Sequence, residues 1–278
     1  VKFLAVSDHN FAFTMDQGRD MLEIRQMVVA HQPKLVGPST SINGVLLGPF
    51  WYYLNLPAFV FGGGDPAYLV YWQIIIYQLA GLLLFWILSK KNKIFASIVL
   101  ILYLLMPVGF NAGRYFWNAN AMPAFTAIYF AVLFASLFSP NKKNLFLLGL
   151  VSGLSFQIEA AFAVFFLPFS LIVLSVNKIK PKQLLPVFIG FTITLIPQLL
   201  FEVRHNFMMS RLFTTEFFGK GEILGEKILF KTRIVDRFYK YRDLAFGIIH
   251  NPLMPTRTFF LIAVIFLLII VIKYKRLE

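Results

Sequence analysis

The stretch AYLVYWQIIIYQLAGLLLFWIL, residues 67–88, carries no charged side chain over 22 consecutive positions. A helix needs roughly 20 apolar residues to cross the hydrocarbon core of a bilayer, so we predict that this stretch spans a membrane. Four shorter stretches that follow it in the sequence are also strongly apolar: residues 94–110, 122–138, 184–201 and 258–272. One more stretch, residues 145–175, would be about 46 Å long as a single helix, which is too long for one span.

The overall composition agrees with this prediction. Hydrophobic residues make up 58% of the 278 residues and charged residues only 14%, whereas soluble domains contain about 25% charged residues. We therefore predict an all-α fold, a polytopic transmembrane helical bundle. The chain has no cysteine, which excludes thiolate chemistry. It begins at Val1, and we expect it to be a piece of a longer protein.

Lysine-rich loops predict the topology, because short loops rich in Lys or Arg stay on the cytoplasmic side. Such clusters lie at residues 90–93, 142–143, 178–182 and 273–276. All of them lie on one side only if residues 145–175 form a hairpin of two short spans that turns near Gln157–Glu159. We therefore predict seven spans. The net charge of +13 then reflects cytoplasmic lysines and not nucleic-acid binding.

This topology divides the chain into four parts. Residues 1–66 form an external loop with amphipathic and interfacial helices, and residues 67–201 form a region of six spans. Residues 202–257 form a second external loop, and residues 258–278 contain the last span and a cytoplasmic tail. Within the first loop, LLGPFWYYLNLPAFVF (46–61) is rich in aromatic residues, which prefer the headgroup level, so we expect an interfacial element there.

The first loop also contains a charged amphipathic helix. Residues Gln17–His31 place apolar side chains at helical spacing, and Thr14 with Gln17 matches a capping box. Asp16 precedes the predicted helix, where a carboxylate accepts hydrogen bonds from free backbone N–H groups. A carboxylate at a helix start also has a fixed direction, so a capping role and a functional role are compatible.

Asp16 and Asp20 lie one helical turn apart on the same face. Two carboxylates at this spacing suit proton transfer or the binding of a divalent metal. Asp16 would either take the proton from an acceptor hydroxyl or hold the metal. Arg19 and Arg25 are close enough to neutralise both carboxylates as ordinary ion pairs, and the spacing leaves these interpretations open.

Four stretches together resemble a known family: DQGRD…KLVGPSTSINGVLLGPFWYYL (16–54), RYFWNANAMPAF (114–125), GLVSGLSFQIEAAF (149–162) and PQLLFEVRHNF (197–207). They are similar to the bacterial GT-C glycosyltransferases, membrane enzymes related to protein O-mannosyltransferases and the lipid A aminoarabinose transferase. The resemblance implies many transmembrane helices, a sugar donor on a polyprenyl phosphate, and an inverting transfer assisted by an acidic residue of a large first external loop. The matching position is Asp16, followed by Gln17 where many relatives have Glu.

Cationic side chains follow a predicted span at Arg204 and His205. A guanidinium is well shaped to bind phosphate, so we expect Arg204 to bind the lipid phosphate with help from His205. The alternative is a snorkelling Arg204 that pairs with Glu202.

Two further polar residues lie at predicted external edges of the membrane. Arg114 sits among aromatic residues, where it would hold the donor sugar or its phosphate, or serve as an interfacial anchor. Glu159 lies at the predicted hairpin turn, and an acidic residue within the membrane suggests function by default. The alternative for Glu159 is a wet turn tip or a pair with Arg114.

The first functional hypothesis is an integral-membrane glycosyltransferase that moves a sugar from a polyprenyl-phosphate donor to a glycan, lipid or protein acceptor. Its catalytic residues would be Asp16 and Asp20, with Asp16 also the ligand of any divalent metal. Its substrate-binding residues would be Arg204, His205, Arg114 and Glu159. We expect it in the bacterial plasma membrane, surrounded by membrane lipids, with the active site on the external face.

Two other hypotheses remain from the sequence. One is a transporter or flippase for lipid-linked saccharides, and the other is a polymerase or ligase that uses polyprenyl-diphosphate glycans. The chain contains no Walker loop, dinucleotide fingerprint or nucleic-acid motif, so we expect no nucleic-acid partner.

Overall fold

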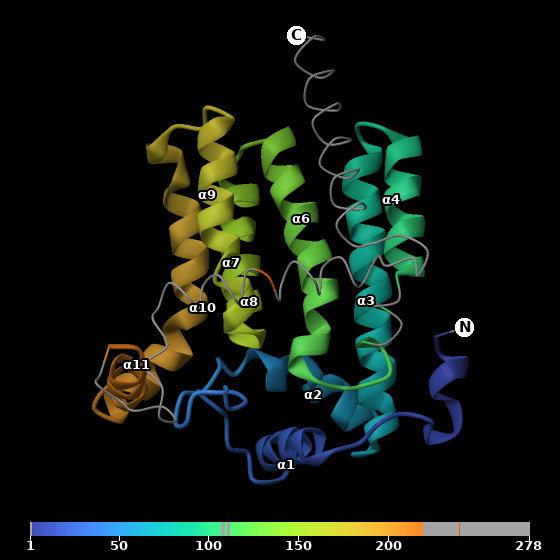
Figure 1. Cartoon of the computed structure of the whole chain (residues 1–278), viewed down its shortest axis with the longest axis vertical. Helices are drawn as coiled ribbons and strands as arrows, with labels where there is room; N and C mark the ends of the chain where they lie inside the picture. Colours follow the sequence, from blue (N-terminus) through green and yellow to red (C-terminus); the bar gives the residue numbers. More distant parts are fainter. Residues whose placement is uncertain (1, 107–108, 110–111, 219–238, 240–278) are drawn as a thin grey trace. The chain divides into compact units, whose positions relative to one another are not determined.

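The computed structural model describes residues 2–106, 109, 112–218 and 239 (Figure 1). The chain divides into two compact units, residues 1–219 and 220–278, so nearly all described residues belong to the first unit. The predicted span at 258–272, the lysine cluster at 273–276 and most of the loop at 202–257 lie outside the described residues.

The described residues form helices, with one isolated antiparallel bridge between Ser39 and Leu46. The α-helices are α1 (Met15–Val29), α2 (Phe50–Phe61), α3 (Pro66–Ser89), α4 (Lys93–Leu105), α6 (Met122–Phe138), α7 (Lys142–Ile158), α8 (Ala160–Ala163), α9 (Phe166–Val176), α10 (Leu185–Arg204) and α11 (Met208–Phe218). The short 3-10 helices are η1 (Leu4–His9), η2 (Asn118–Ala121) and η3 (Pro181–Leu184). The all-α prediction is confirmed for this part of the chain.

Three helical stretches of the described chain are long and apolar enough to cross a membrane: Pro66–Ser89, Asn118–Phe138 and Pro181–Arg204. Two other apolar stretches, Lys93–Leu105 and Ala160–Val176, are shorter. Of the seven predicted spans, three are therefore supported by length and composition.

The chain reverses direction where the lysine pattern predicted a turn. α7 ends at Ile158, and the chain returns through α8 into α9 (Figure 1). The ends of α3, α6 and α9 and the starts of α4, α7 and α10 lie together at one end of the helices. This end carries Lys90, Lys91, Lys93, Lys142, Lys143, Lys178, Lys180 and Lys182. α1, α2 and the turn at α8 lie at the opposite end.

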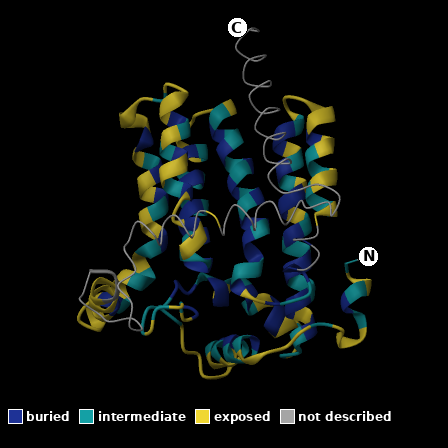
Figure 2. Cartoon of the chain, viewed as in Figure 1, coloured by how far each residue is buried: buried dark blue, intermediate teal, exposed yellow. Residues whose placement is uncertain are grey.

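The long helices carry many exposed positions, drawn in yellow in Figure 2, and large apolar residues are among them. Examples are Leu82 on α3, Leu102 on α4, Ile172 on α9 and Leu200 on α10. An apolar surface of this extent is unfavourable in water, whereas it matches the hydrocarbon of a bilayer. This burial pattern favours a membrane environment for these helices.

α7 and α10 pack with their backbones in close approach. A Cβ added at Gly149 of α7 would lie less than 3.0 Å from the carbonyl oxygen of Val187 on α10. A Cβ added at Gly190 of α10 would overlap the carbonyl oxygen of Phe146 on α7 in the same way. Small residues are the usual means by which membrane helices approach this closely. The contact therefore depends on glycine at both positions.

α2 forms the layer between α1 and the long helices (Figure 1). The helix occupies most of the predicted interfacial element and contacts α1, α3 and α7. Its Phe50 N–H donates to Gln157 Oε1 at 3.0 Å, and Gln157 in turn donates to the carbonyl of Thr194 on α10. Buried Gln157 therefore connects α2 to α7 and α10.

Candidate functional site

The first turn of α1 is fixed by Thr14 and Gln17. Gln17 Oε1 accepts hydrogen bonds from Thr14 N at 2.6 Å and from Thr14 Oγ1 at 2.7 Å, which confirms the predicted capping box. α1 therefore starts at Met15 and ends at Val29, two residues earlier at each end than predicted. The N-cap is Thr14, so the interpretation of Asp16 as the capping residue is wrong. Asp16 lies within the first turn and is available for another role.

A single guanidinium joins the two carboxylates of α1. Arg19 Nη1 lies 3.1 Å from Asp16 Oδ1, and Arg19 Nε and Nη2 lie 3.0 and 2.9 Å from Asp20 Oδ1. The ion pairs that the sequence left open are therefore present and run through Arg19. The Asp16 side chain is 39% exposed, so Arg19 fixes its direction without burying it.

Asp20 is the buried end of this arrangement, with 1% of its surface exposed. Its Oδ1 accepts from Arg19, and its Oδ2 accepts from Trp51 Nε1 at 2.9 Å. Burial raises the pKa of the Asp20 carboxyl to about 6, although Arg19 and the bond from Trp51 oppose the rise. Because both oxygens are engaged inside the protein, Asp20 suits a positioning role better than contact with a substrate.

This burial predicts a pH-dependent stability that Asp20→Asn should remove. An ordinary Asp has a pKa of about 3.9 when unfolded, so the folded chain binds the extra proton between about pH 4 and pH 6. The contribution of Asp20 to the free energy of unfolding is therefore greatest below pH 4 and falls by about 3 kcal/mol as the pH rises through 6. Thermal unfolding of both proteins from pH 4 to pH 7.5 measures the difference. Parallel curves for wild type and variant would contradict this account of Asp20.

The loop between α1 and α2 closes through its two Gly-Pro pairs. Gly37 N donates to Leu47 O and Leu47 N donates to Pro38 O, each at 2.8 Å. A Cβ at Gly37 would overlap the carbonyl of Gly48, so the two glycines lie against each other. The closed loop brings Ser39 to Arg19, whose Nη1 donates to Ser39 Oγ at 3.1 Å. The two Gly-Pro pairs therefore close the loop in a way that helps to position the Arg19 guanidinium.

The segment before α6 meets the start of α1. The hydroxyls of Thr14 and Tyr115 lie 3.0 Å apart, and Thr14 precedes Asp16 by two residues. Phe116 stacks on Trp51 with ring centroids 4.9 Å apart. Arg114 is partly buried and directly precedes Tyr115. This segment therefore contacts the neighbours of both carboxylates. Tyr115 contacts Thr14, close to Asp16 in the sequence, and Phe116 contacts Trp51, which binds Asp20.

Glu159 lies at the junction of α7 and α8 and belongs to the same end of the helices. Buried Asn118 donates through Nδ2 to Ile158 O at 2.7 Å and to Glu159 Oε2 at 3.3 Å. Asn118 follows Phe116 closely, so the Glu159 turn is connected to Trp51 through residues 116–118. Glu159 supports this end of the fold, and its side chain is partly exposed.

Arg204 and His205 end α10 at a different corner. Both are exposed, and the His205 ring stacks on Phe201 at 4.0 Å between centroids. Glu202 does not pair with Arg204 in the described part of the chain. It accepts hydrogen bonds from the backbone N–H groups of Met209 and Ser210 at 2.9 and 3.0 Å, and from the Ser210 hydroxyl, at the start of α11.

This α10–α11 corner contacts the loop between α1 and α2, through Leu46 with Gln198 and Met209. In Figure 1 that loop lies between α11 and α1. The structure therefore brings Asp16, Asp20, Arg114 and Glu159 into one connected region. It leaves Arg204 and His205 beyond the intervening loop.

Sequence spacing did not single out the residues that connect the region, which are Ser39, Trp51, Tyr115 and Asn118. The available signals were the paired Gly-Pro turns and the aromatic residues next to them. Among the described residues no group of three or more His, Asp or Glu side chains gathers in a way that would hold a metal. A metal at Asp16 stays a prediction.

Comparisons of the chain with protein-family models, with curated proteins and with solved structures found no match.

Proposed function

We propose that the chain belongs to an inverting membrane glycosyltransferase that moves a sugar from a polyprenyl-phosphate donor to an acceptor hydroxyl. The proposal rests chiefly on one observation, the accessible carboxylate of Asp16, which is held by Arg19. Thr14, two residues before Asp16, contacts the Tyr115 hydroxyl. This carboxylate lies at the end of the helices opposite the lysines. By the charge rule, that end faces the outside of a bacterial plasma membrane.

In the proposed reaction Asp16 acts as the general base. It removes the proton from the acceptor hydroxyl as that oxygen forms a bond to the anomeric carbon of the sugar. The bond between this carbon and the phosphate oxygen breaks, and the electron pair leaves with the polyprenyl phosphate. Attack on the face opposite the leaving group inverts the anomeric centre. The accessible surface of Asp16 supports this role, because the base must reach a hydroxyl of the substrate.

Arg19 and Asp20 act as positioning residues in this proposal. Arg19 holds Asp16, and its own direction is set by two bonds to Asp20 Oδ1. Trp51 holds the other oxygen of Asp20. Because Arg19 already fixes the direction of the Asp16 carboxylate, this base loses less orientational freedom when the substrate binds.

The leaving phosphate needs a cationic partner, and Arg114 suits this role better than Arg204. The segment of Arg114 contacts the start of α1 through Tyr115. Arg204 and His205 lie at the α10–α11 corner, beyond the loop that follows α1. A guanidinium in this segment would stabilise the negative charge that develops on a phosphate bound there.

A donor assay tests the proposal. The protein is incorporated in lipid nanodiscs with polyprenyl-monophosphate mannose, glucose or arabinose, each labelled in the sugar, and membranes of the producing host supply acceptors. Transfer of label from a monophosphate donor supports the proposal. Transfer from diphosphate donors alone would assign a polymerase or ligase, and movement of the intact donor across the membrane of a liposome would assign a flippase.

A further inference from the structure

One end of the long helices carries positive charge that the described chain does not neutralise. The turns between α3 and α4, α6 and α7, and α9 and α10 (residues 89–93, 139–143 and 177–184) contain no Asp or Glu. Their lysines are all exposed, and none forms an ion pair with a described residue. We call these side chains the lysine surface: Lys90, Lys91, Lys93, Lys142, Lys143, Lys178, Lys180 and Lys182.

Two cations of the first loop, at the opposite end of the helices, have acidic partners within the protein. Arg19 pairs with Asp16 and Asp20, and Lys34 Nζ lies 2.5 Å from Glu23 Oε2. The lysine surface has no such partners, so its lysines repel one another unless anions from outside the protein approach them.

The three turns of the lysine surface are neighbours at one end of the helices (Figure 1). Lys91 Nζ, in the first turn, lies 5.2 Å from the ring centroid of Phe138, at the end of α6. The second and third turns are joined by the close approach of Gly149 on α7 to Val187 on α10, near the starts of both helices. The lysines therefore form one continuous surface and not three separate patches.

Three of these lysines stand at helix starts, where a cation is unfavourable. Lys93 is the first residue of α4, and Lys142 and Lys143 are the first two residues of α7. Neither helix has an acidic residue in its first turn. The start of a helix carries partial positive charge, so it repels lysine and attracts an anion. The loop-charge rule needs lysines on this side of the membrane but does not need them at these positions.

The lysine surface lies at the depth of lipid headgroups. Lys90 Nζ lies 3.7 Å from the ring centroid of Trp86, whose side chain is exposed on α3. Tryptophan prefers the level of the headgroups in a membrane. A neutral ring attracts the ammonium group without cancelling its charge, so Lys90 still offers a full positive charge to a phosphate.

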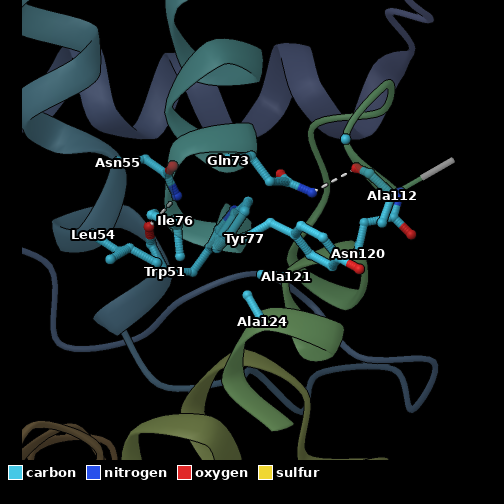
Figure 3. A pocket seen from close by; sticks show the side chains of 11 residues that line it. Trp51, Leu54, Asn55, Gln73, Ile76, Tyr77, Ala112, Asn120, Ala121 and Ala124 are labelled. Atoms are coloured by element: carbon cyan, nitrogen blue, oxygen red, sulfur yellow. Dashed lines mark hydrogen bonds between the residues drawn. The ribbon is translucent and has the colours of Figure 1, made fainter. Parts of the chain in front are cut away.

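The pocket between α2, α3 and the segment that leads into α6 is no alternative site for such an anion (Figure 3). Its described lining consists of apolar and neutral polar side chains, without a cation. Inside it the Gln73 amide already donates to Ala112 O at 2.8 Å, which the dashed line in Figure 3 marks. An anionic headgroup therefore finds its charge partners on the lysine surface.

We propose that the lysine surface binds the headgroups of anionic phospholipids, with lysines of neighbouring turns around one phosphodiester group. Lysine is a common point-charge partner of phosphate, and basic clusters beside membrane helices attract anionic lipids. The inference goes beyond the proposed glycosyltransferase, because it uses residues at the other end of the helices. It makes a particular class of lipid a partner of the protein.

Native mass spectrometry in a neutral detergent tests this proposal. The protein is mixed with equal amounts of phosphatidylglycerol and phosphatidylcholine that have the same acyl chains, so that the two probes differ only in the headgroup. We expect wild type to retain phosphatidylglycerol in excess, and the excess to shrink as the salt concentration rises. Equal retention of the two lipids by wild type would overturn the proposal without the need for any variant.

Two triple variants locate the bound lipid. Replacement of Lys91, Lys142 and Lys143 by Gln should lower the ratio of retained phosphatidylglycerol to phosphatidylcholine by about tenfold or more, whereas replacement of the same three by Arg should keep it. The matched control removes three exposed cations from the opposite end, by replacement with Gln, and should retain lipid as wild type does: Arg25, Arg204 and Arg211. An equal fall in the lysine and control variants would overturn the proposal, as would a fall in the control variant alone.

This proposal and the proposed function fail separately. A preference for phosphatidylglycerol that depends on the lysine surface, without transfer in the donor assay, would overturn the glycosyltransferase and keep the lipid site. Transfer by a protein that retains both lipids equally would do the reverse.

Discussion

Asp16→Asn is expected to lower sugar transfer by about 10²–10⁴-fold, the usual contribution of a general base. The amide has nearly the shape of the carboxylate but does not accept the proton of the acceptor hydroxyl. Folding should persist, because the change removes one partly exposed ion pair to Arg19, and such pairs contribute less than about 1 kcal/mol. The measurement is the initial rate of label transfer in the donor assay, together with the thermal unfolding midpoint.

Asp8→Asn is the matched control for this substitution. Asp8 lies in η1, is exposed, and has a φ of 53°, a conformation that Asn adopts readily. The control should transfer sugar at the wild-type rate. Full activity of the Asp16→Asn protein would remove Asp16 from the mechanism, and equal loss in both variants would show that the effect is not specific to the site.

Gly149→Ala should cost about 3 kcal/mol or more of stability, because one methyl group would have to occupy the space of the Val187 carbonyl. The helices α7 and α10 would move apart, and the bonds of Gln157 that tie α2 to α10 would break. We expect loss of monodisperse protein after purification, or a large fall in its unfolding temperature.

Gly18→Ala makes the same chemical change in α1 but should change the stability of the protein in the opposite direction. A Cβ at Gly18 would meet only Phe13 Cε1, at an ordinary 3.8 Å. Alanine in a helix is favoured over glycine by about 0.5–1 kcal/mol, so this variant should be slightly more stable than wild type. Similar destabilisation by both changes would contradict the close approach of α7 and α10.

The sequence predicted the features that depend on local pattern. The uncharged run at 67–88 falls within α3, the capping box of Thr14 and Gln17 is present, and the turn after α7 falls near Glu159. Each of these follows from hydrophobicity, capping chemistry or charge within a short window. Even the ends of α1 were wrong by only two residues.

The candidate site was harder to predict because its contacts join distant parts of the chain. Asp16 and Asp20 looked equivalent by spacing, yet Asp20 is buried because Trp51, 31 residues later, packs against it. Glu202 looked like a partner for Arg204, yet the start of α11 offers its carboxylate three donors at close range. Helical spacing says which side chains share a face and leaves open what packs on that face.

The carboxylates of Asp16 and Asp20 share the single guanidinium of Arg19. With both acids ionised, Asp16, Arg19 and Asp20 together carry one surplus negative charge. A lipid phosphate that approaches this region meets repulsion until another cation offsets it. Burial raises the pKa of Asp20 to about 6, so acidification through pH 6 protonates this carboxylate and removes the surplus. The protein's affinity for an anionic substrate should thus grow as its surroundings become mildly acidic.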